Sequence, residues 1–266
     1  MKHVLIACVN YNSYRELINY LRSIETSLEL VDELKVDVVV ADNSTNRQNI
    51  ECDIYKRLKV EQVFFENIGY LPAAASVINQ RILLKQFDFI IISNVDVEVD
   101  KCFFKNLSVI NNDELTGWIA PQIWTEEESR DKNPKVLGRY SKSKLEKIKL
   151  LYKYPLLDYI YTNTLYLKKK SRPQYSEMEI YAGHGSFMIL TKRFFDFYKE
   201  INYPIFLFGE ELFLAELNRK VGLRVRYIPD LKILDNEHVS TSKMKKKIYY
   251  KYNLDSIKYI LDTFYE

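Results

Sequence analysis

The stretch "FDFIIISNVDV", Phe87 to Val97, joins a continuous apolar run to a polar end and decides the fold class. The apolar residues Phe89 to Ile92 are typical of a strand that is buried on both faces. Asn94 and Asp96 follow at the point where this strand must end. In open α/β sheets, ligands bind at the carboxyl ends of the strands. The stretch therefore predicts a buried sheet and a site at its edge.

Strand patterns and helix patterns alternate along the first half of the chain. The expected strands are "HVLIACV" (3–9), "KVDVVVADN" (35–43) and "VEQVFFEN" (60–67), besides the run quoted above. The expected helices are "NYNSYRELINYLRSI" (10–24), "LPAAASVINQRILLK" (71–85) and "DKCFFKNLSVI" (100–110). This alternation predicts an α/β fold with a mostly parallel, doubly wound sheet.

The composition describes a chain that can bury a large core and gives no support to nucleic-acid binding. The chain has 266 residues, of which 47% are hydrophobic, and a net charge of only +3. Cys8, Cys52 and Cys102 lie far apart without metal-ligand spacing, so we expect reduced thiols in a cytosolic protein. No apolar run approaches the roughly 20 residues that span a bilayer. We therefore expect a soluble or peripheral cytoplasmic protein.

Two segments combine lysine with aromatic residues. The first runs from Arg139 to Pro173, with ten basic and two acidic residues, and the second is "SKMKKKIYYKYNLDSIKYILDTFY" (242–265). In the first, Leu145, Ile148 and Leu151 recur at helical spacing with lysines beside them. Such helices are either solvated or suited to an anionic membrane surface.

Polar residues follow the early strands, and each has two interpretations. Asp42, Asn43 and Ser44 can bind a nucleobase or ribose, or they can form an Asx-turn that bonds its own backbone. Asp96 can bind a hard divalent cation, with Asn94 adding a neutral oxygen, or it can belong to a solvated loop. Asp100 is better placed to cap the next helix, so capping does not explain Asp96.

Three further positions are candidates on weaker grounds. Gly69, two residues after Asn67, permits close backbone approach at a helix start, which attracts diphosphate, or it is a plain turn. His184 stands between two glycines and is either a ligand-binding residue or a structural one. His238 is a candidate nitrogen ligand for a cation of the Mn²⁺ type, or a histidine of a surface loop.

The stretch "FLFGEELFLAEL" (206–217) places two glutamates at an expected helix start. Glu210, Leu214 and Leu217 would share one face, which is apolar apart from the glutamate. Acidic residues suit a first helical turn, but a carboxylate on an apolar face needs a partner. We therefore expect Glu210 to point inward and Glu211 to stand at the rim of a cleft.

In order and spacing, these pieces resemble one family. The ordered set is "VNYNS … VVVADNS … ENIGY … ISNVDV … GHGSFMIL … FLFGEELFL … RVRYIP … EHVS". It resembles a family 2 glycosyltransferase of the GT-A fold, particularly the rhamnosyltransferase-like enzymes of bacterial surface polysaccharide synthesis. The resemblance covers nearly the whole chain and is weakest across 139–173. It implies a GT-A type doubly wound sheet flanked by helices, with a basic-aromatic helical insertion and a C-terminal helix.

The resemblance implies a donor site along the early strands. Asp42 matches the acidic residue that binds the nucleobase of the donor. The other residues of this donor site are Asn10, Asn12, Asn43, Asn67, Gly69 and Asn94. Asp96 matches the surviving carboxylate of the metal-binding D-x-D position, and His238 matches a late histidine that joins the metal or the diphosphate. Asn94 departs from the family pattern, which puts the identity of the metal in doubt.

The resemblance also implies an acceptor site. The stretch that lines the sugar and the acceptor comprises Gly183, His184, Gly185 and Ser186. Glu210 and Glu211 match a Glu-Asp pair whose second member is usually the catalytic base. Glu211 is one methylene longer than the usual aspartate, so the backbone must compensate if it is the base.

The activity implied is inverting transfer of a sugar from a UDP- or dTDP-sugar donor to a hydroxyl of a glycan, with Mg²⁺ or Mn²⁺. The implied acceptor is a lipid-linked glycan at the inner face of the cell membrane, where the basic segments would make peripheral contact. An alternative is a catalytically silent subunit that binds sugar nucleotide or glycan. The expected catalytic domain covers residues 1–238. It comprises a nucleotide-binding half to about residue 125, an insertion at about 139–173 and an acceptor half from about 174. A basic, aromatic C-terminal helical segment is expected over 239–266.

Overall fold

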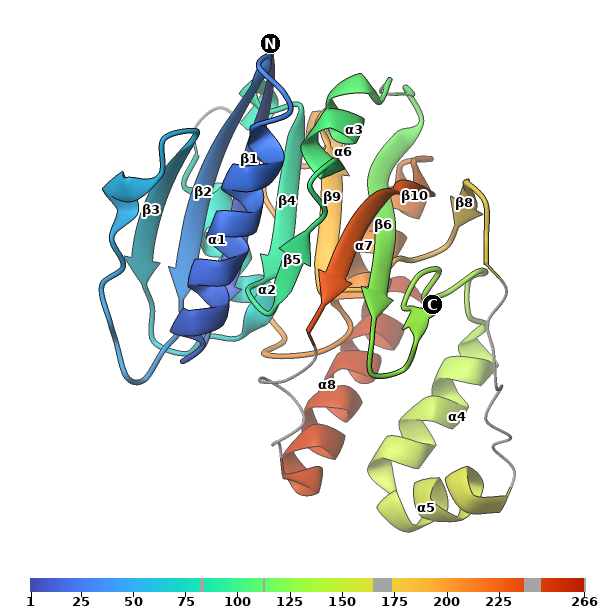
Figure 1. The fold of residues 1–266 in the computed structure, drawn as a ribbon. Coiled ribbons are helices and arrows are strands. Elements are labelled where there is room, and N and C mark those ends of the chain that lie inside the picture. Colours follow the sequence, from blue (N-terminus) through green and yellow to red (C-terminus); the bar gives the residue numbers. More distant parts are fainter. Residues whose placement is uncertain (82–83, 112, 165–173, 237–244, 266) are drawn as a thin grey trace.

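The computed structural model describes residues 1–81, 84–111, 113–164, 174–236 and 245–265. Within these ranges, one ten-stranded sheet carries helices on both faces (Figure 1). The strands are β1 (Lys2–Asn10), β2 (Leu34–Asp42), β3 (Leu58–Phe64), β4 (Phe89–Asn94), β5 (Val97–Val99), β6 (Thr116–Thr125), β7 (Arg130–Asp131), β8 (Met178–Ile180), β9 (Phe187–Thr191) and β10 (Arg224–Asp235). The expected α/β class is confirmed.

The α-helices are α1 (Tyr14–Leu28), α2 (Tyr70–Asn79), α3 (Phe103–Val109), α4 (Lys142–Lys153), α5 (Pro155–Thr164), α6 (Lys192–Phe197), α7 (Glu210–Lys220) and α8 (Lys246–Phe264). Two short 3-10 helices are η1 (Cys52–Ile54) and η2 (Leu84–Gln86). The expected helix over 100–110 begins only at Phe103. Cys102 takes the N-cap position in place of the expected Asp100, whose carboxylate accepts the backbone N–H of Cys102 at 2.8 Å.

The strand order is β3-β2-β1-β4-β9-β6-β10-β5, with β7 beside β6 and β8 beside β10. Strands β3, β2, β1 and β4 are parallel, as the sequence predicts. Strand β9 is antiparallel to both β4 and β6. It therefore begins at the edge where β4 ends, with Phe187 opposite Ser93. This reversal carries the segment before β9 to the carboxyl edge of the parallel strands.

The sheet divides the apolar residues into two cores, one on each face. Phe89 and Ile91 belong to the core beneath α1 and α3, whereas Ile90 and Ile92 belong to the core beneath α2 and α6. All four are completely buried. The alternation follows from the two-residue period of a strand, and burial on both faces explains why the sequence run is apolar throughout.

The basic-aromatic segments form helices that pack on the second core. Leu145 is completely buried there, and Ile148 packs against the same core. Leu145 and Ile148 of the stripe that was a candidate for membrane contact therefore face the protein. Ile257 and Ile260 of α8 also join this core, and α8 packs against α4 and α7. The predicted division of the chain at residues 125, 139, 174 and 239 stays a prediction.

Among the described residues, no helix has both the length and the apolar character that crossing a bilayer requires.

Candidate active site

Polar residues from three strands and from the segment before β9 meet at the carboxyl edge of the parallel strands. Asn10 lies opposite Asp42 in the β1–β2 pairing, and Val9 lies opposite Asn94 in the β1–β4 pairing. The backbone N–H of Asn94 donates to the carbonyl of Ser186 at 2.9 Å, just before β9 begins. The fold thus brings together stretches that the sequence separates by more than 170 residues.

The two glutamates at the start of α7 both lie next to Gly185. Glu211 Oε1 accepts the backbone N–H of Gly185 at 3.3 Å. A methyl group at Gly185 would lie 2.5 Å from Glu210 Oε1. A side chain at this position would therefore displace the first carboxylate.

Tyr70 ties this contact to the other half of the site. Its hydroxyl donates to the carbonyl of Gly185 at 2.7 Å. On the other side, the Asn43 side chain donates to the carbonyl of Gly69 at 2.8 Å. A continuous path of hydrogen bonds and peptide links thus runs from the loop after β2, through the start of α2, to the Glu210–Glu211 pair.

Sequence reasoning did not single out Tyr70. Burial raises the pKa of Tyr70 well above its ordinary value, and the negative charges of Glu210, Glu211 and Asp96 add to the rise. These carboxylates therefore act on one region of the site, and Tyr70 remains a neutral donor within it. The signal available in the sequence was an aromatic residue directly after Gly69, the glycine at the expected helix start.

Glu210 is a perturbed acid. Burial raises the pKa of Glu210 well above the usual range, and repulsion from Glu211 raises it further. The charge of Lys135 opposes this rise. Two carboxylates that share one small volume cannot both ionise freely, so Glu210 keeps its proton to a higher pH than an exposed glutamate does. Such a pair is typical of sites that move protons.

His184 is oriented by its neighbours. The amide oxygen of Asn133 accepts the His184 backbone N–H at 2.8 Å, and the Ser186 backbone N–H donates to His184 Nδ1 at 3.2 Å. Because Nδ1 accepts this bond, the proton of the neutral ring lies on Nε2. Packing also confines Gly183, since a Cβ atom at this position would lie 2.7 Å from the Cβ of Ala120.

Asp42 is completely buried and organises the loop that follows β2. It accepts hydrogen bonds from the Ser44 backbone at 2.9 Å, from Gln62 at 2.8 Å and from Asn10 at 3.2 Å. The first of these is the Asx-turn that was the alternative interpretation of this stretch. Contact of Asp42 with a nucleobase stays a prediction.

Asn12 and Tyr11 lie at the outer side of the same loop. Asn12 has a left-handed backbone with φ of 54° and accepts the backbone N–H of Asn46 at 3.0 Å. Tyr11, next to Asn10 in the sequence, exposes 44% of its surface. Sequence reasoning missed this tyrosine, although it stands between two asparagines that were candidates.

Gly69 makes the predicted close backbone approach, but to another part of the chain. A side chain there would lie 2.1 Å from the carbonyl oxygen of Phe206, and the backbone φ is +101°. The same carbonyl accepts the Tyr70 backbone N–H at 3.0 Å. The start of α2 is thereby joined to the loop before α7. Asn67 is exposed in front of it.

Asp96 is nearly buried at the end of the region after β4. Its carbonyl accepts the backbone N–H of Asn236 at 3.1 Å, which fixes the end of β10 beside it. His238 follows closely in sequence but lies outside the described residues. Within the described ranges, no group of three His, Cys, Asp or Glu side chains could hold a metal. A carboxylate with the amide of Asn94 fits a hard cation that takes its other ligands from diphosphate and water.

The loop before α7 is held by the C-terminal helix. Phe208 and Gly209 both have left-handed backbones, with φ of 69° and 81°. Tyr203 donates to the Phe208 carbonyl at 2.6 Å. A side chain at Gly209 would lie 2.1 Å from Ser256 Oγ of α8. Helix α8 thus packs directly on the turn that presents Glu210 to the site.

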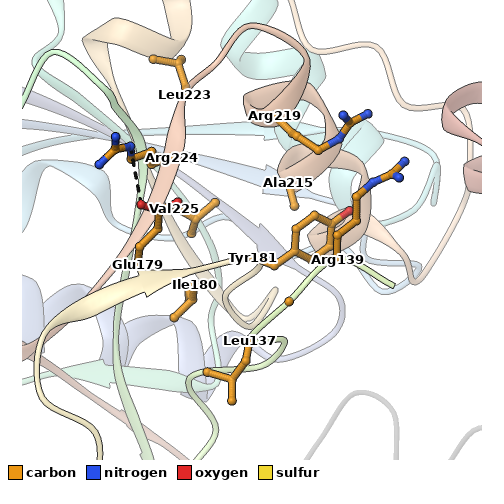
Figure 2. A pocket seen from close by; sticks show the side chains of 11 residues that line it. Leu137, Arg139, Glu179, Ile180, Tyr181, Ala215, Arg219, Leu223, Arg224 and Val225 are labelled. Carbon is orange, nitrogen blue, oxygen red and sulfur yellow. Dashed lines mark ion pairs between the residues drawn. The ribbon is translucent and has the colours of Figure 1, made fainter. Parts of the chain in front are cut away.

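A second cluster anchors α7 farther along. Glu216 is completely buried and binds Arg139 at 2.7 Å and Arg219 at 2.8 Å, while Tyr181 donates to the same carboxylate. Burial alone would raise the pKa of Glu216, but these hydrogen bonds outweigh it and lower the pKa. Figure 2 shows Arg139, Arg219 and Tyr181 together at one wall of a cavity of about 320 Å³. This cavity is lined by none of the predicted site residues.

Comparison with known proteins identifies the fold. No protein-family model matches the chain, and no curated protein matches it. GalNAc-T7, solved with UDP, GalNAc and Mn²⁺, aligns with 98% of the chain at a TM-score of 0.63 and 12% identity. TarS 1–349 of S. aureus, solved with UDP-GlcNAc, aligns with all of it at a TM-score of 0.59 and 12% identity. The chain has a GT-A-type fold.

These two proteins are glycosyltransferases of that fold. The chain spans 48% of the length of the GalNAc-T7 chain and 68% of that of TarS 1–349. Because the identity is only 12%, the likeness establishes the fold and not the activity. The expectation of a GT-A sheet is confirmed, whereas the assignment to family 2 and to its rhamnosyltransferase-like members stays a prediction.

Two glycines with left-handed backbones give a matched test of the α7–α8 contact. Gly209→Ala and Gly222→Ala each cost about 1–2 kcal/mol of backbone strain. Only at Gly209 does the new methyl group meet packed atoms, because nothing lies within 4 Å at Gly222. We expect Gly209→Ala to lower the free energy of unfolding by a further ~1–3 kcal/mol, measured by urea denaturation.

A third variant separates packing from strain in this comparison. Ser256→Ala removes the oxygen nearest the new methyl group, so adding it to Gly209→Ala should restore part of the lost stability. Equal losses at the two glycines, with no rescue by Ser256→Ala, would show that α8 does not pack tightly on Gly209.

Proposed function

We propose that this chain is a glycosyltransferase that moves a sugar from a UDP- or dTDP-sugar to a hydroxyl of a glycan, with inversion. The observation that carries the proposal is the pair Glu210 and Glu211, both next to Gly185, at the carboxyl edge of a GT-A-type sheet. The nucleotide-sugar donor is supported by two neighbours of this fold, which were solved with UDP, GalNAc and Mn²⁺ and with UDP-GlcNAc.

Glu211 is the general base in this proposal. Its carboxylate takes the proton of the acceptor hydroxyl as that oxygen attacks the anomeric carbon. The new bond joins the acceptor oxygen to the anomeric carbon, and the bond between that carbon and the diphosphate oxygen breaks on the opposite face. The diphosphate leaves with the bonding electrons, and the configuration of the sugar inverts.

Glu210 supports the base without replacing it. Because its pKa is raised, Glu210 remains protonated where exposed carboxyl groups are ionised, and it adds no second negative charge beside the base. The backbone N–H of Gly185 donates to Glu211, and Tyr70 fixes the carbonyl of the same glycine. This arrangement holds Glu211 in a preorganised position before the acceptor arrives.

The residues around the base have complementary roles. The ring of His184 is held beside Ser186, in the stretch that the resemblance places against the sugar and the acceptor. Asp42 shapes the loop that would receive the nucleobase, and Tyr11 offers a ring on which a base can stack. Asn10 and Asn43 hold this loop against the rest of the site.

Asp96 and Asn94 would hold a divalent cation, with His238 as the further candidate ligand. When bound, Mg²⁺ or Mn²⁺ would neutralise the negative charge on the departing diphosphate. The presence of Mn²⁺ with UDP in the GalNAc-T7 structure supports a divalent cation here. Metal dependence is part of the proposal, and Asn94 in place of an aspartate predicts weak metal binding without the donor.

The acceptor in this proposal is a lipid-linked glycan of bacterial surface polysaccharide synthesis. The resemblance in sequence supports the pathway, and the lysine-rich aromatic helices support peripheral contact with an anionic membrane at its cytoplasmic face. A second candidate is a catalytically silent subunit that binds sugar nucleotide or glycan. The single carboxylate of the Asn94–Asp96 position favours it, because metal binding is weaker there.

A thermal-shift panel tests the donor. UDP, dTDP and their sugars, each with and without Mg²⁺ or Mn²⁺, should raise the unfolding temperature in the order of their affinity, because a ligand of the native state stabilises it by mass action. A purine nucleotide diphosphate is the matched control. No stabilisation by any pyrimidine nucleotide with either metal would contradict the proposed donor class.

Glu211→Gln tests the base. The amide has nearly the same shape but cannot take a proton, so transfer should fall by a factor on the order of 10²–10⁴ while donor binding is kept. Transfer and donor hydrolysis are both measured, since a silent subunit hydrolyses no donor. Glu200→Gln, at an exposed position outside the site, is the control variant. Near-normal turnover by Glu211→Gln would remove this residue from the base role.

Glu210 gives a prediction about pH. The unfolded chain loses the Glu210 proton near pH 4.5, whereas burial and repulsion from Glu211 hold it to about pH 8 in the folded chain. Between these values the unfolded state binds fewer protons, so stability falls as pH rises. Glu210→Gln removes this loss of stability. The unfolding temperature of the variant should therefore rise relative to that of wild type between pH 5 and pH 8. The unfolding temperature of Glu200→Gln should change with pH as that of wild type does. If the unfolding temperature of Glu210→Gln also followed wild type, the raised pKa of Glu210 would be contradicted.

A further inference from the structure

Exposed apolar side chains gather on three helical segments that lie outside the sheet. We call this set the docking tip, and its members are Leu150, Tyr154, Leu156, Leu157, Tyr159, Ile248 and Tyr249. Leu156 exposes 71% of its surface and Tyr159 exposes 66%. Single exposed apolar residues are ordinary on a protein surface, but a contiguous group marks an interaction site.

The three segments of the docking tip are held together. The hydroxyl of Tyr250, in the first turns of α8, donates to Asp158 of α5 at 2.6 Å. The ring of Tyr152, on α4, lies 6.2 Å from that of Tyr249 and 6.3 Å from that of Tyr250. Figure 1 shows α4, α5 and the start of α8 beyond one end of the sheet. The exposed side chains therefore belong to one body at one end of the molecule.

Lysines surround the docking tip. Residues 142–159 and 245–251 contain nine lysines and two acidic residues. Both acidic residues have partners, since Glu146 pairs with Lys149 and Asp158 accepts the Tyr250 hydroxyl. Exposed apolar and aromatic side chains on lysine-rich helices are the composition that binds an anionic bilayer, where the rings and leucines enter the interface and the lysines meet the headgroups.

The charge argues against a second copy of this chain as the occupant. Two docking tips placed face to face would bring two sets of lysines together, and this like-charge contact is unfavourable. A partner of opposite charge is required. A bilayer also accepts the convex end of a helical body, because its headgroups rearrange around inserted side chains.

The docking tip lies close to the proposed catalytic pair. The ring of Phe208, two residues before Glu210, lies 5.4 Å from that of Tyr249. Ser256 of the same helix packs against Gly209. In Figure 1 the arrowheads of β2, β3, β6 and β10 point toward the end of the molecule where α4 and α5 lie. The carboxyl edge of the sheet and the docking tip thus face the same side.

We propose that the docking tip inserts into the interface of an anionic membrane and thereby holds Glu211 just above the headgroups. The acceptor hydroxyl would then be presented from the membrane surface, on a glycan whose lipid lies in the bilayer. The consequence for the acceptor rests on the proposed function, whereas the docking itself does not.

The test is binding of the full chain to vesicles of phosphatidylcholine with and without about one third phosphatidylglycerol, followed by flotation. We expect binding only to the anionic vesicles, and weaker binding at about 0.15 M salt than at about 0.01 M. Leu156→Ser with Ile248→Ser should reduce partitioning more than tenfold, because two exposed apolar side chains no longer enter the interface. Lys153→Glu with Lys247→Glu should reduce it by about 25-fold or more, since each lysine contributes roughly fivefold.

Matched variants control for exposure and charge elsewhere on the molecule. Val109→Ser with Leu30→Ser replaces two exposed apolar side chains of other elements, and Lys59→Glu with Lys105→Glu reverses two lysines far from α4 and α8 in the sequence. Both pairs should bind vesicles like wild type. All substituted side chains of the tip are exposed, so their unfolding temperatures should stay near that of wild type, which excludes misfolding as the cause.

Three outcomes would overturn the inference. One is no binding of wild type to anionic vesicles at low salt, and another is equal loss in the tip variants and the controls. The third is a mass twice 31.7 kDa by light scattering that the tip variants abolish, without vesicle binding, because the tip would then join two copies. Donor hydrolysis measured without lipid tests the proposed function separately, so failure of one leaves the other standing.

Discussion

The contact between Gly185 and the two glutamates of α7 is the constraint on which the site depends. It exists only because β9 runs antiparallel to β4 and begins at the edge where β4 ends. A side chain at Gly185 would displace Glu210, and the backbone N–H of the same residue orients Glu211. The sheet topology places Gly185 beside the first turn of α7. Glu210, whose pKa is raised, lies in that turn. The proposed chemistry needs no further rearrangement to bring its two carboxylates together.

Much of the fold could be predicted from the sequence because its strands are buried on both faces. The run Phe89 to Ile92 divides between two cores, which is why it is apolar throughout and recognisable. The antiparallel course of β9 could not be predicted, since strand direction depends on pairing partners distant in the chain. The stripe with Leu145 and Ile148 was also ambiguous, because an apolar helix face does not reveal whether a core or a membrane covers it.

Part of the local structure at the candidate site could be predicted from the sequence, but not the contacts that assemble it. The helix start at Glu210 and the close approach at Gly69 followed from local rules, and both are present. That the partner of Gly69 is the Phe206 carbonyl, and that Tyr70 links the two halves, depends on contacts across more than 100 residues. From the sequence alone, Asp42 could belong to a nucleobase site or to an Asx-turn. The hydrogen bond from the Ser44 backbone to its carboxylate forms the turn.

The packing of Ser256 on Gly209 has a consequence for folding. Contacts of the site connect residues 43 with 69, 70 with 185, and 209 with 256, so most are distant in sequence. Loop closure over such distances is slow, and native pairings of this kind form late. Because these contacts join segments that are distant in the sequence, the alignment of the two carboxylates depends on the whole fold and not on the parallel half of the sheet alone.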